Sequence, residues 1–326
     1  MTIAVVGGGA WGTALANIIA QNEDALLWAR EAEVVEAVNS GHENPLFLPG
    51  VALSPRVRAT TAIADLARAD LWLMVPPAQF LGRVLQSAPL DHGPTLILCA
   101  KGVEAGTHRL MAEVAAEAAP QSALAVLSGP SFAAEAARGL PTAVTLAAHT
   151  MEQAGALAER IARPTFRPYA SDDVTGAEIG GAVKNVLAIA CGVVIGAGLG
   201  ENARAAIIAR GFAEMTRFGI ARGARPETLA GLSGLGDLVL TCGSTQSRNM
   251  RLGMALGEGQ TAEQALAGKL SVAEGAATAP VLVEAAEKAG VDMPICTTVA
   301  ALLAGRIAVR EAMDHLLTRP LRPELN

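Results

Sequence analysis

A lysine and an asparagine stand side by side, at Lys184 and Asn185, at the start of a long apolar stretch. The residues from Val186 to Ala190 are all apolar, which favours a buried helix for the pair. Burial would lower the pKa of the lysine and suit its ammonium group to proton transfer. The amide of Asn185 offers both a donor and an acceptor to a hydroxyl or a carbonyl. The alternative is a lysine whose long stem carries its charge out to solvent.

A second lysine, Lys101, follows the apolar run 95–100 and precedes Gly102. Lysine is scarce in this chain, with 4 lysines against 21 arginines. The position of Lys101 is of interest because the carboxyl ends of the strands in a doubly wound sheet form the ligand crevice. We therefore expect Lys101 at the site, and the alternative is an ordinary solvated lysine at a strand end.

A polar segment in the second half of the chain contributes a third group of side chains. Asp237 and Thr241 are four residues apart, so a helix would place them on one face. Ser247, Arg248 and Asn249 then offer a hydroxyl, a guanidinium and an amide in succession. Arginine is well suited to bidentate binding of a phosphate. The alternative interpretation is a polar loop in which Ser247 caps a helix.

Glycines near the N-terminus form the pattern G-x-G-x-x-G, carried by Gly7, Gly9 and Gly12. The pattern follows a predicted strand at 2–6 and opens a predicted helix at 10–20, which is the context that dinucleotide binding requires. There, the first glycine makes the turn, the second lets a pyrophosphate approach, and the third allows close helix packing. The helix N-terminus supplies N–H groups to the phosphates. The alternative is a glycine-rich turn that binds no ligand.

The residue that ends the second predicted strand bears on which dinucleotide binds. An NAD site usually has Asp or Glu at this point, to hold the ribose 2′-hydroxyl. Here the apolar run 25–29 ends in Arg30, 18 residues after Gly12, and a cation suits a 2′-phosphate. We therefore predict a preference for NADP(H), with NAD(H) possible because Glu31 follows. The alternative for Arg30 is an ordinary exposed strand end.

The elements that must position these groups follow from hydrophobic periodicity. Strands are expected at 2–6, 25–29, 71–75, 95–100, 123–127 and 143–147, with helices at 10–20, 107–119 and 131–138 between them. Only helices are expected later, at 181–195, 202–218, 226–232, 261–267, 278–289 and 293–304. This predicts an α/β Rossmann-type N-terminal domain with a parallel sheet, residues 1–175, and an all-α C-terminal domain, residues 176–326. We expect the boundary between 171 and 178.

Composition argues against several classes of function. The net charge is −6, Lys and Arg form no run, and aromatic residues make up only 3% of the chain, which argues against nucleic-acid binding. The four cysteines, at 99, 191, 242 and 296, form no C-x-x-C pair, so we expect neither a disulfide framework nor a metal site. Free thiols are typical of the cytoplasm, where we expect the protein.

Two uncharged stretches resemble a targeting segment and a membrane segment in their composition. The run from Asn185 to Gly200 is shorter than the ~20 residues of a membrane span, so we predict a buried helix or helix pair there and no membrane span. The N-terminal apolar run has no positive side chain before Arg30, which argues against a signal peptide.

Taken together, these segments resemble the bacterial glycerol-3-phosphate dehydrogenase (NAD(P)+) family. The resemblance covers nearly the whole chain and several motifs carry it in order. They are Gly7–Ala16 (GGGAWGTALA), Val75–Pro77, Lys101–Glu104, Ser128–Ala133 (SGPSFA), Lys184–Val186, Gly231–Cys242 (GLSGLGDLVLTC), Ser247–Asn249 and Val272–Gly275. Their joint occurrence is far more specific than a G-x-G-x-x-G pattern alone.

The resemblance implies a reaction and a set of residues that perform it. It implies reversible NAD(P)H-dependent reduction of dihydroxyacetone phosphate to sn-glycerol 3-phosphate for phospholipid synthesis, by a homodimer. It makes Lys184 the proton donor and acceptor. It implies a substrate site of Lys101, Gly129, Ser131, Asn185, Asp237, Thr241, Ser247, Arg248 and Asn249. It implies a dinucleotide site of Gly7, Gly9, Ala10, Trp11, Gly12, Arg30, Lys101, Ala133, Arg248, Val272 and Glu274.

The chain departs from the family pattern at two positions, and two other functions compete with this one. Ala10 stands where the family often has Ser, and Ala273 where it often has Val, which bears only on how tightly the coenzyme binds. A reductase resembling the β-hydroxyacid dehydrogenases would separate its active-site Lys and Asn by one helical turn, whereas Lys184 and Asn185 are adjacent. A catalytically inactive NADP-binding module would lack a key polar group.

Overall fold

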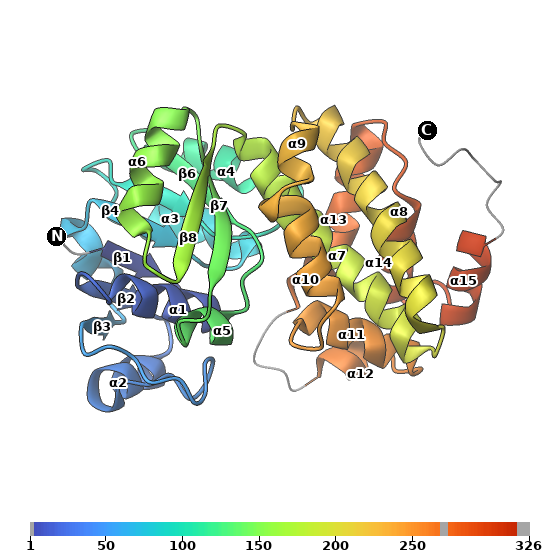
Figure 1. Cartoon of the computed structure of the whole chain (residues 1–326), viewed down its shortest axis with the longest axis horizontal. Coiled ribbons are helices and arrows are strands. Elements are labelled where there is room, and N and C mark those ends of the chain that lie inside the picture. The colour runs from blue at the N-terminus through green and yellow to red at the C-terminus, as the bar shows by residue number, and fades with distance from the viewer. Residues whose placement is uncertain (1–2, 268–272, 318–326) are drawn as a thin grey trace.

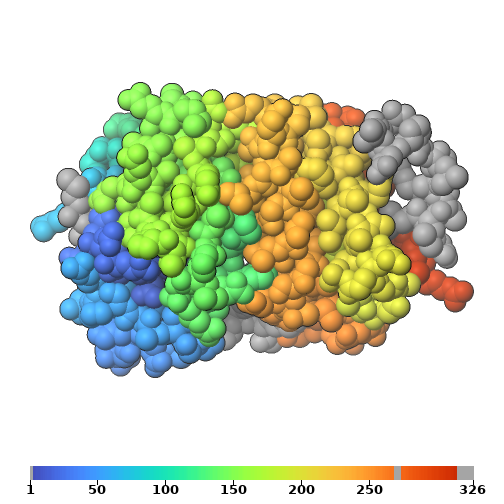
Figure 2. Space-filling model, viewed as in Figure 1, coloured from blue at the N-terminus to red at the C-terminus, as the bar shows by residue number. Residues whose placement is uncertain are grey.

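The computed structural model of the chain describes residues 3–267 and 273–317. The chain forms two halves that lie side by side (Figure 1). The first half is built around one sheet and the second half is helical, with the helix α7 (Val174–Gly196) running from one into the other. Atoms of the two halves adjoin across the middle of the molecule, where orange atoms of the second half meet green atoms of the first (Figure 2).

The sheet has eight strands in the spatial order β3-β2-β1-β4-β5-β6-β7-β8. Their bounds are β1 (Ile3–Val6), β2 (Ala25–Trp28), β3 (Val57–Thr60), β4 (Leu71–Met74), β5 (Thr95–Leu98), β6 (Leu124–Ser128), β7 (Thr142–Ala148) and β8 (Phe166–Ser171). The strands from β3 to β6 pair in parallel. Central strands such as β1 (IAVV) and β4 (LWLM) are buried throughout, as parallel strands covered on both faces must be.

Helices cover both faces of the sheet. They are α1 (Ala10–Ile19), α2 (Ala32–Gly41), η1 (Ile63–Arg68), η2 (Ala78–Phe80), α3 (Leu81–Ser87), α4 (Met111–Ala118), α5 (Ala133–Ala137) and α6 (Met151–Ile161). One apolar core joins the sheet to α1, α2, α5 and α6, and a second joins its other face to η1, α3 and α4. The predicted Rossmann-type domain with a mainly parallel sheet, followed by a helical region, is therefore confirmed.

Three features of the sheet differ from the prediction. Strand β7 pairs with β6 antiparallel, with Ser128 opposite Thr145, because the short helix α5 packs against α1 and the chain then turns back. Strands β3 and β8 were not predicted. Both lie at edges of the sheet, where polar side chains such as Arg167 and a proline such as Pro168 are tolerated and the apolar pattern is weak. Helices α2, α3 and α6 were missed for a similar reason, since their outer faces are polar.

The second half packs its helices around α7. The others are α8 (Gly200–Ala221), α9 (Pro226–Leu229), the π-helix η3 (Leu232–Gly236), α10 (Asp237–Cys242), α11 (Arg248–Gly257), α12 (Ala262–Leu266), α13 (Glu274–Lys288), α14 (Pro294–Leu303) and α15 (Val309–Leu317). Within the described residues, α7 alone is long and apolar enough to cross a membrane, but 89% of its most apolar window is buried inside the protein. It is the core helix of this half, as predicted for 185–200.

Helix α7 begins earlier than predicted and connects the two halves. The carboxylate of Asp173 caps its first turn by accepting a hydrogen bond from the Gly176 N–H at 2.8 Å. One turn later, the buried Glu178 accepts a hydrogen bond from the Ala112 N–H at 2.8 Å, in the first turn of α4. Burial raises the pKa of Glu178 to about 8, although hydrogen bonds from the backbone N–H groups of Ala112 and Met111 oppose the rise. These contacts fix α7 against the sheet half.

Glycines allow α7 and α11 to cross with their backbones in contact. A methyl group added to Gly253 would lie 2.0 Å from the Ile189 carbonyl oxygen, and one on Gly192 would lie 2.2 Å from that of Met250. No side chain larger than hydrogen fits at either position without moving a helix. The close crossing brings the N-terminus of α11 beside Asn185, and so beside the predicted site.

Candidate functional site

Two lysines from different halves of the molecule share one carboxylate. Lys101 Nζ donates a hydrogen bond to Asp237 Oδ2 at 2.6 Å, and Lys184 Nζ donates to Asp237 Oδ1 at 2.6 Å. Lys184 Nζ also donates to Thr241 Oγ1 at 2.9 Å, and that hydroxyl lies 3.2 Å from Asp237 Oδ1. The structure thus brings together four side chains that the sequence analysis chose from three separate segments.

One strand and two helices position these four side chains. Lys101 follows β5 at the carboxyl edge of the sheet, as predicted. Lys184 lies halfway along α7, and its side chain is only 10% exposed, so the alternative of a solvated lysine is wrong. Asp237 is the first residue of α10, which continues directly from the π-helix η3. Thr241 lies one turn further along α10, on the face that the spacing predicted.

The shared carboxylate determines the charge states of the cluster. Burial, with a smaller contribution from the nearby charge of Lys101, lowers the pKa of Lys184 to about 8, although the Asp237 carboxylate opposes the fall. Burial alone would raise the pKa of Asp237, but the two ammonium groups outweigh burial and hold that pKa below its ordinary value. At neutral pH the cluster is therefore one buried anion between two cations, and Lys184 is the cation that loses its proton more readily than an ordinary lysine.

Asn185 points into a second network next to the cluster. Asn249 Nδ2 donates to Asn185 Oδ1 at 2.9 Å, and Asn249 Oδ1 accepts from the Gly275 N–H at 3.0 Å. This chain of bonds connects α7, α11 and α13 through two buried amides. With its oxygen engaged by Asn249, the amide of Asn185 retains its N–H donors for a ligand.

The first turn of α11 holds the remaining members of the predicted phosphate site. Ser247 caps this helix, accepting a hydrogen bond from the Met250 N–H at 3.2 Å, so its cap role is real. Arg248 is exposed, and its guanidinium makes no hydrogen bond or ion pair with any residue that the structure describes. Glu274, the first residue of α13, lies near both lysines and Arg248, and burial raises its pKa against their influence.

Gly129 and Ser131 lie on the sheet side of the cluster. The carbonyl oxygen of Gly129 accepts hydrogen bonds from Lys101 Nζ at 3.2 Å and from Ser131 Oγ at 3.1 Å. The sequence analysis assigned no role to Ser128, whose buried hydroxyl has no hydrogen-bond partner in the described part of the chain. A methyl group on Gly181 would lie 2.9 Å from that hydroxyl and 3.2 Å from Lys101 Cγ, so Ser128 lies beside the lysine stem. Two signals in the sequence could have pointed to it: its position at the end of a predicted strand and its place at the start of the SGPSFA motif.

The glycine loop has the geometry that the pattern predicts. Gly7 has φ of +123°, a conformation that side chains disfavour, and its N–H donates to the Trp28 carbonyl oxygen at 2.9 Å. A methyl group on Gly12 would lie 1.9 Å from the Gly7 carbonyl oxygen, so the helix packs directly on the turn. A methyl group on Gly9 would meet nothing within 4 Å, which leaves open space in front of the N-terminus of α1. This cradle fits the pyrophosphate of a dinucleotide.

Other predicted dinucleotide contacts surround this loop at varying distances. Ala10 and Trp11 form the first turn of α1, and the Trp11 ring packs against Phe166 at 6.5 Å between centroids. Ala133 begins α5, which packs on α1. Arg30 follows β2, and its guanidinium contacts the Glu31 carboxylate at 2.8 Å. Val272 lies outside the residues that the structure describes.

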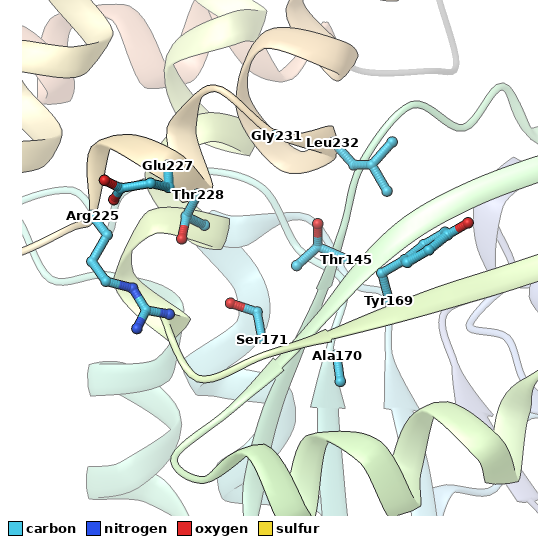
Figure 3. A pocket seen from close by; sticks show the side chains of 9 residues that line it. All are labelled: Thr145, Tyr169, Ala170, Ser171, Arg225, Glu227, Thr228, Gly231 and Leu232. Carbon is cyan, nitrogen blue, oxygen red and sulfur yellow. The ribbon is translucent and has the colours of Figure 1, made fainter.

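A separate pocket of about 580 Å³ opens at the β8 edge of the sheet (Figure 3). It is lined by Thr145, Tyr169, Ala170, Ser171, Arg225, Glu227, Thr228, Gly231 and Leu232. Its one arginine, Arg225, is paired with Asp172. None of the predicted site residues lines this pocket. Among the described residues, no group of three or more His, Cys, Asp or Glu side chains is placed to hold a metal ion.

Comparison with known proteins agrees with this geometry. A family model for the N-terminus of NAD-dependent glycerol-3-phosphate dehydrogenase matches residues 2–154, and the corresponding C-terminal model matches residues 173–314. A glycerol-3-phosphate dehydrogenase (NAD(P)+) of Erythrobacter litoralis is 61% identical over 323 residues, covering 99% of this chain and 97% of that protein. One of the same name from Caulobacter vibrioides is 60% identical over 326 residues, covering 99% and 98%.

Solved structures lead to the same family. A crystal structure of glycerol-3-phosphate dehydrogenase from Coxiella burnetii has a TM-score of 0.92 and 38% identity, covering 98% of this chain and 99% of that one. The resemblance expected from the motifs is therefore confirmed, and the chain belongs to the NAD-dependent glycerol-3-phosphate dehydrogenase family.

Proposed function

We propose that this protein reversibly reduces dihydroxyacetone phosphate to sn-glycerol 3-phosphate with NAD(P)H, a reaction consistent with its relatives' name, glycerol-3-phosphate dehydrogenase (NAD(P)+). The observation that carries the proposal is the buried ammonium group of Lys184, which shares Asp237 with Lys101 at 2.6 Å from each lysine. A reductase of a ketone needs a group that gives up a proton near neutral pH, and a lysine with a pKa of about 8 meets that need.

The proton and the charge are handled by the chain's own residues. The nicotinamide, when bound, supplies the hydride to the carbonyl carbon. As negative charge develops on the carbonyl oxygen, Lys184 Nζ donates its proton to that oxygen and becomes neutral. Lys101 stabilises the developing charge electrostatically. Its ammonium group lies near that of Lys184, because both bond to the carboxylate of Asp237. Asp237 and Thr241 hold the Lys184 amine in place, and in the reverse direction that amine accepts the proton from the alcohol.

The substrate phosphate is held by the first turn of α11. Arg248 supports this role because it is exposed and has no hydrogen-bonded partner among the described residues. Backbone N–H groups at the same helix N-terminus favour an anion, although Ser247 already accepts the Met250 N–H. Asn185 and Asn249 stand between this turn and Lys184, where their amides can orient the hydroxyl groups. Anchoring the phosphate brings the carbonyl to a fixed position, which is a gain from proximity.

The coenzyme is held by the glycine loop, with Gly7, Gly9 and Gly12 shaping the cradle for its pyrophosphate. We infer a preference for NADP(H) from Arg30, whose side chain is free to move to a 2′-phosphate because it is 83% exposed. The Glu31 carboxylate accepts a hydrogen bond from the Arg30 guanidinium. It can instead accept hydrogen bonds from the ribose hydroxyls of NAD(H), so we expect the protein to use both coenzymes.

Further parts of the proposal do not rest on the site itself. The family resemblance implies a homodimer and supply of glycerol 3-phosphate for phospholipid synthesis. The free thiols favour a cytoplasmic location, and the change from alternating strands and helices to helices alone predicts a division into domains between residues 175 and 176. The start of α7 at Val174 and the separate apolar cores of the two halves support that division. Sedimentation of the purified chain would test the homodimer directly.

The deciding experiment follows the oxidation of NADPH and of NADH in parallel, with dihydroxyacetone phosphate as substrate. Turnover that yields sn-glycerol 3-phosphate supports the proposal. Turnover only with β-hydroxyacid substrates or their keto forms would favour the other reductase family. NADPH binding to folded protein without any turnover would favour the inactive sensing module instead.

A further inference from the structure

The peptide between Gly8 and Gly9 is held by a side chain from a distant loop. Asn44 Nδ2 donates hydrogen bonds to the Gly8 carbonyl oxygen at 2.9 Å and to Thr13 Oγ1 at 2.8 Å. Thr13 Oγ1 in turn donates to the same Gly8 oxygen at 3.3 Å. Both Asn44 and Thr13 are completely buried. The Gly8 carbonyl is therefore drawn into the protein by two donors.

Asn44 cannot turn away from this position without losing further bonds. Its Oδ1 accepts a hydrogen bond from the Phe47 N–H at 3.1 Å, and its own carbonyl oxygen accepts one from the Leu48 N–H at 2.9 Å. The donors and the acceptor of the amide are all engaged, so its orientation is determined by its partners. A buried amide with this many bonds is costly to disturb, because each lost bond leaves an unsatisfied group.

Fixing the Gly8 carbonyl also fixes the direction of the next N–H. A trans peptide is planar, and its N–H points opposite to its C=O. With the Gly8 oxygen pointing inward to Asn44 and Thr13, the Gly9 N–H must point outward. No described residue accepts a hydrogen bond from that N–H. It faces the open space in front of α1, where a methyl group on Gly9 would meet nothing within 4 Å.

We propose that Asn44 is a positioning residue for coenzyme binding, which aims the Gly9 N–H at the pyrophosphate by holding the Gly8 carbonyl. The inference rests on the proposed function only in taking the ligand to be a dinucleotide. The pyrophosphate is common to NADPH and NADH, so Asn44 affects affinity for both and does not choose between them. Arg30 and Glu31, which follow the carboxyl end of β2, determine the preference between the two coenzymes.

A second asparagine provides a matched control. Asn17 lies one turn after Thr13 on α1 and holds the same loop, since its Oδ1 accepts the Ser54 N–H at 2.8 Å. Its Nδ2 donates to the Ala137 carbonyl oxygen at 3.1 Å. Asn17→Ala therefore loosens the loop without touching the peptide between Gly8 and Gly9. A role of Asn44 in loop stability alone would make both variants behave alike.

The test measures dissociation constants of the full chain for NADPH, NADH and ADP-ribose by titration calorimetry. In Asn44→Ala each constant should rise by about tenfold, the effect of misaligning a hydrogen bond to a charged group. At saturating coenzyme, kcat and the KM for dihydroxyacetone phosphate should stay unchanged. Asn17→Ala should lower the Tm but leave all three dissociation constants unchanged. If Asn44→Ala does not fold, Thr13→Val removes one of the two donors to Gly8 and should weaken all three ligands in the same direction.

Three outcomes would overturn the inference. They are wild-type affinity in folded Asn44→Ala, equal weakening in Asn17→Ala, and weakening confined to NADPH, which would mean that the 2′-phosphate site had moved instead. Failure of the proposed function is distinguishable from these. A wild-type protein that binds both coenzymes but does not reduce dihydroxyacetone phosphate would contradict the proposed reaction and leave the role of Asn44 standing on the binding data.

Discussion

Lys184 and Arg30 are both cations proposed to serve the reaction, yet they stand in opposite surroundings. The Lys184 side chain is 10% exposed and is bonded to Asp237 and Thr241, two residues from another helix. The Arg30 side chain is 83% exposed, and among the described residues its guanidinium bonds only to its sequence neighbour Glu31. An exposed ion pair of this kind is worth about 0–1 kcal/mol, whereas removing one partner of a buried pair costs about 3–5 kcal/mol.

The difference indicates which properties of the enzyme can change easily. Lys101 and Lys184 both depend on Asp237: replacing either lysine removes one of the two ion pairs of that carboxylate, and replacing Asp237 leaves both ammonium groups without it. Arg30 can be replaced at little structural cost, because no other element relies on it. We therefore expect the chemistry to tolerate almost no substitution and the coenzyme preference to shift with one.

The largest effect should come from Lys184→Ala. Loss of the proton donor should lower kcat for ketone reduction by about 10²–10⁴-fold, while the dissociation constant for NADPH stays unchanged. Steady-state kinetics and coenzyme titration measure the two quantities. Lys288→Ala is the matched control, because Lys288 is exposed on α13 and far from Asp237 in the fold. Activity that survived largely intact in Lys184→Ala would show that another group donates the proton.

The pH dependence of the two directions should be opposite. Reduction needs protonated Lys184, so its kcat/KM should be constant at low pH and fall as pH rises through about 8, the pKa of that lysine. Oxidation of glycerol 3-phosphate needs the neutral amine, so its kcat/KM should rise toward the same pH and then level off. Asp237→Asn removes the carboxylate that favours the charged form and should move both breaks to lower pH. If kcat/KM changes at the same pH in Asp237→Asn as in the wild type, the group that titrates is not Lys184.

The glycine loop and the lysine cluster also differ in how well the sequence predicts them. The cofactor loop is local, so Gly7 to Gly12 between a strand and a helix was enough to predict its geometry. The contact of Lys101 and Lys184 with Asp237 joins residues 136 and 53 positions apart. Spacing along the chain indicated that each side chain was unusual, and the family resemblance placed them in one site, but neither indicated that both lysines bind the same carboxylate.

Other features were hidden because their signal lies in tertiary contacts. Asn44 stands in a proline-rich loop and looks like an ordinary turn residue, until its bonds to Gly8 and Thr13 are seen. Edge strands β3 and β8 carry too many polar residues to show an apolar run. Helix α7 starts seven residues before the predicted bound of 181, because Asp173 caps it and close packing overrides the low helix propensity of Gly180 and Gly181.

A smaller effect, on stability, tests whether the buried region depends on the close crossing of α7 and α11. Gly253→Ala would place a methyl group 2.0 Å from the Ile189 carbonyl oxygen and should destabilise the protein by about 1–3 kcal/mol. Gly155→Ala, inside α6 with nothing within 4 Å, should instead stabilise it by about 0.5–1 kcal/mol. Chemical denaturation measures both. If both variants changed the free energy of unfolding equally, α7 and α11 would not be packed as closely as the contact between Gly253 and Ile189 indicates.

The smallest effect is expected at the exposed end of the comparison. Arg30→Ala should raise the KM for NADPH by about tenfold or less, because a charge-assisted hydrogen bond to the 2′-phosphate is worth about 1.5–3 kcal/mol at most and solvent screens it. The KM for NADH, which lacks that phosphate, should hardly change, and the Tm should stay as in the wild type. The NADPH effect should shrink as salt is added, since the guanidinium is open to solvent. If the KM values for NADPH and NADH rose equally, Arg30 would not bind the 2′-phosphate. A fall in Tm would mean that Arg30 supports the fold as the buried lysines do.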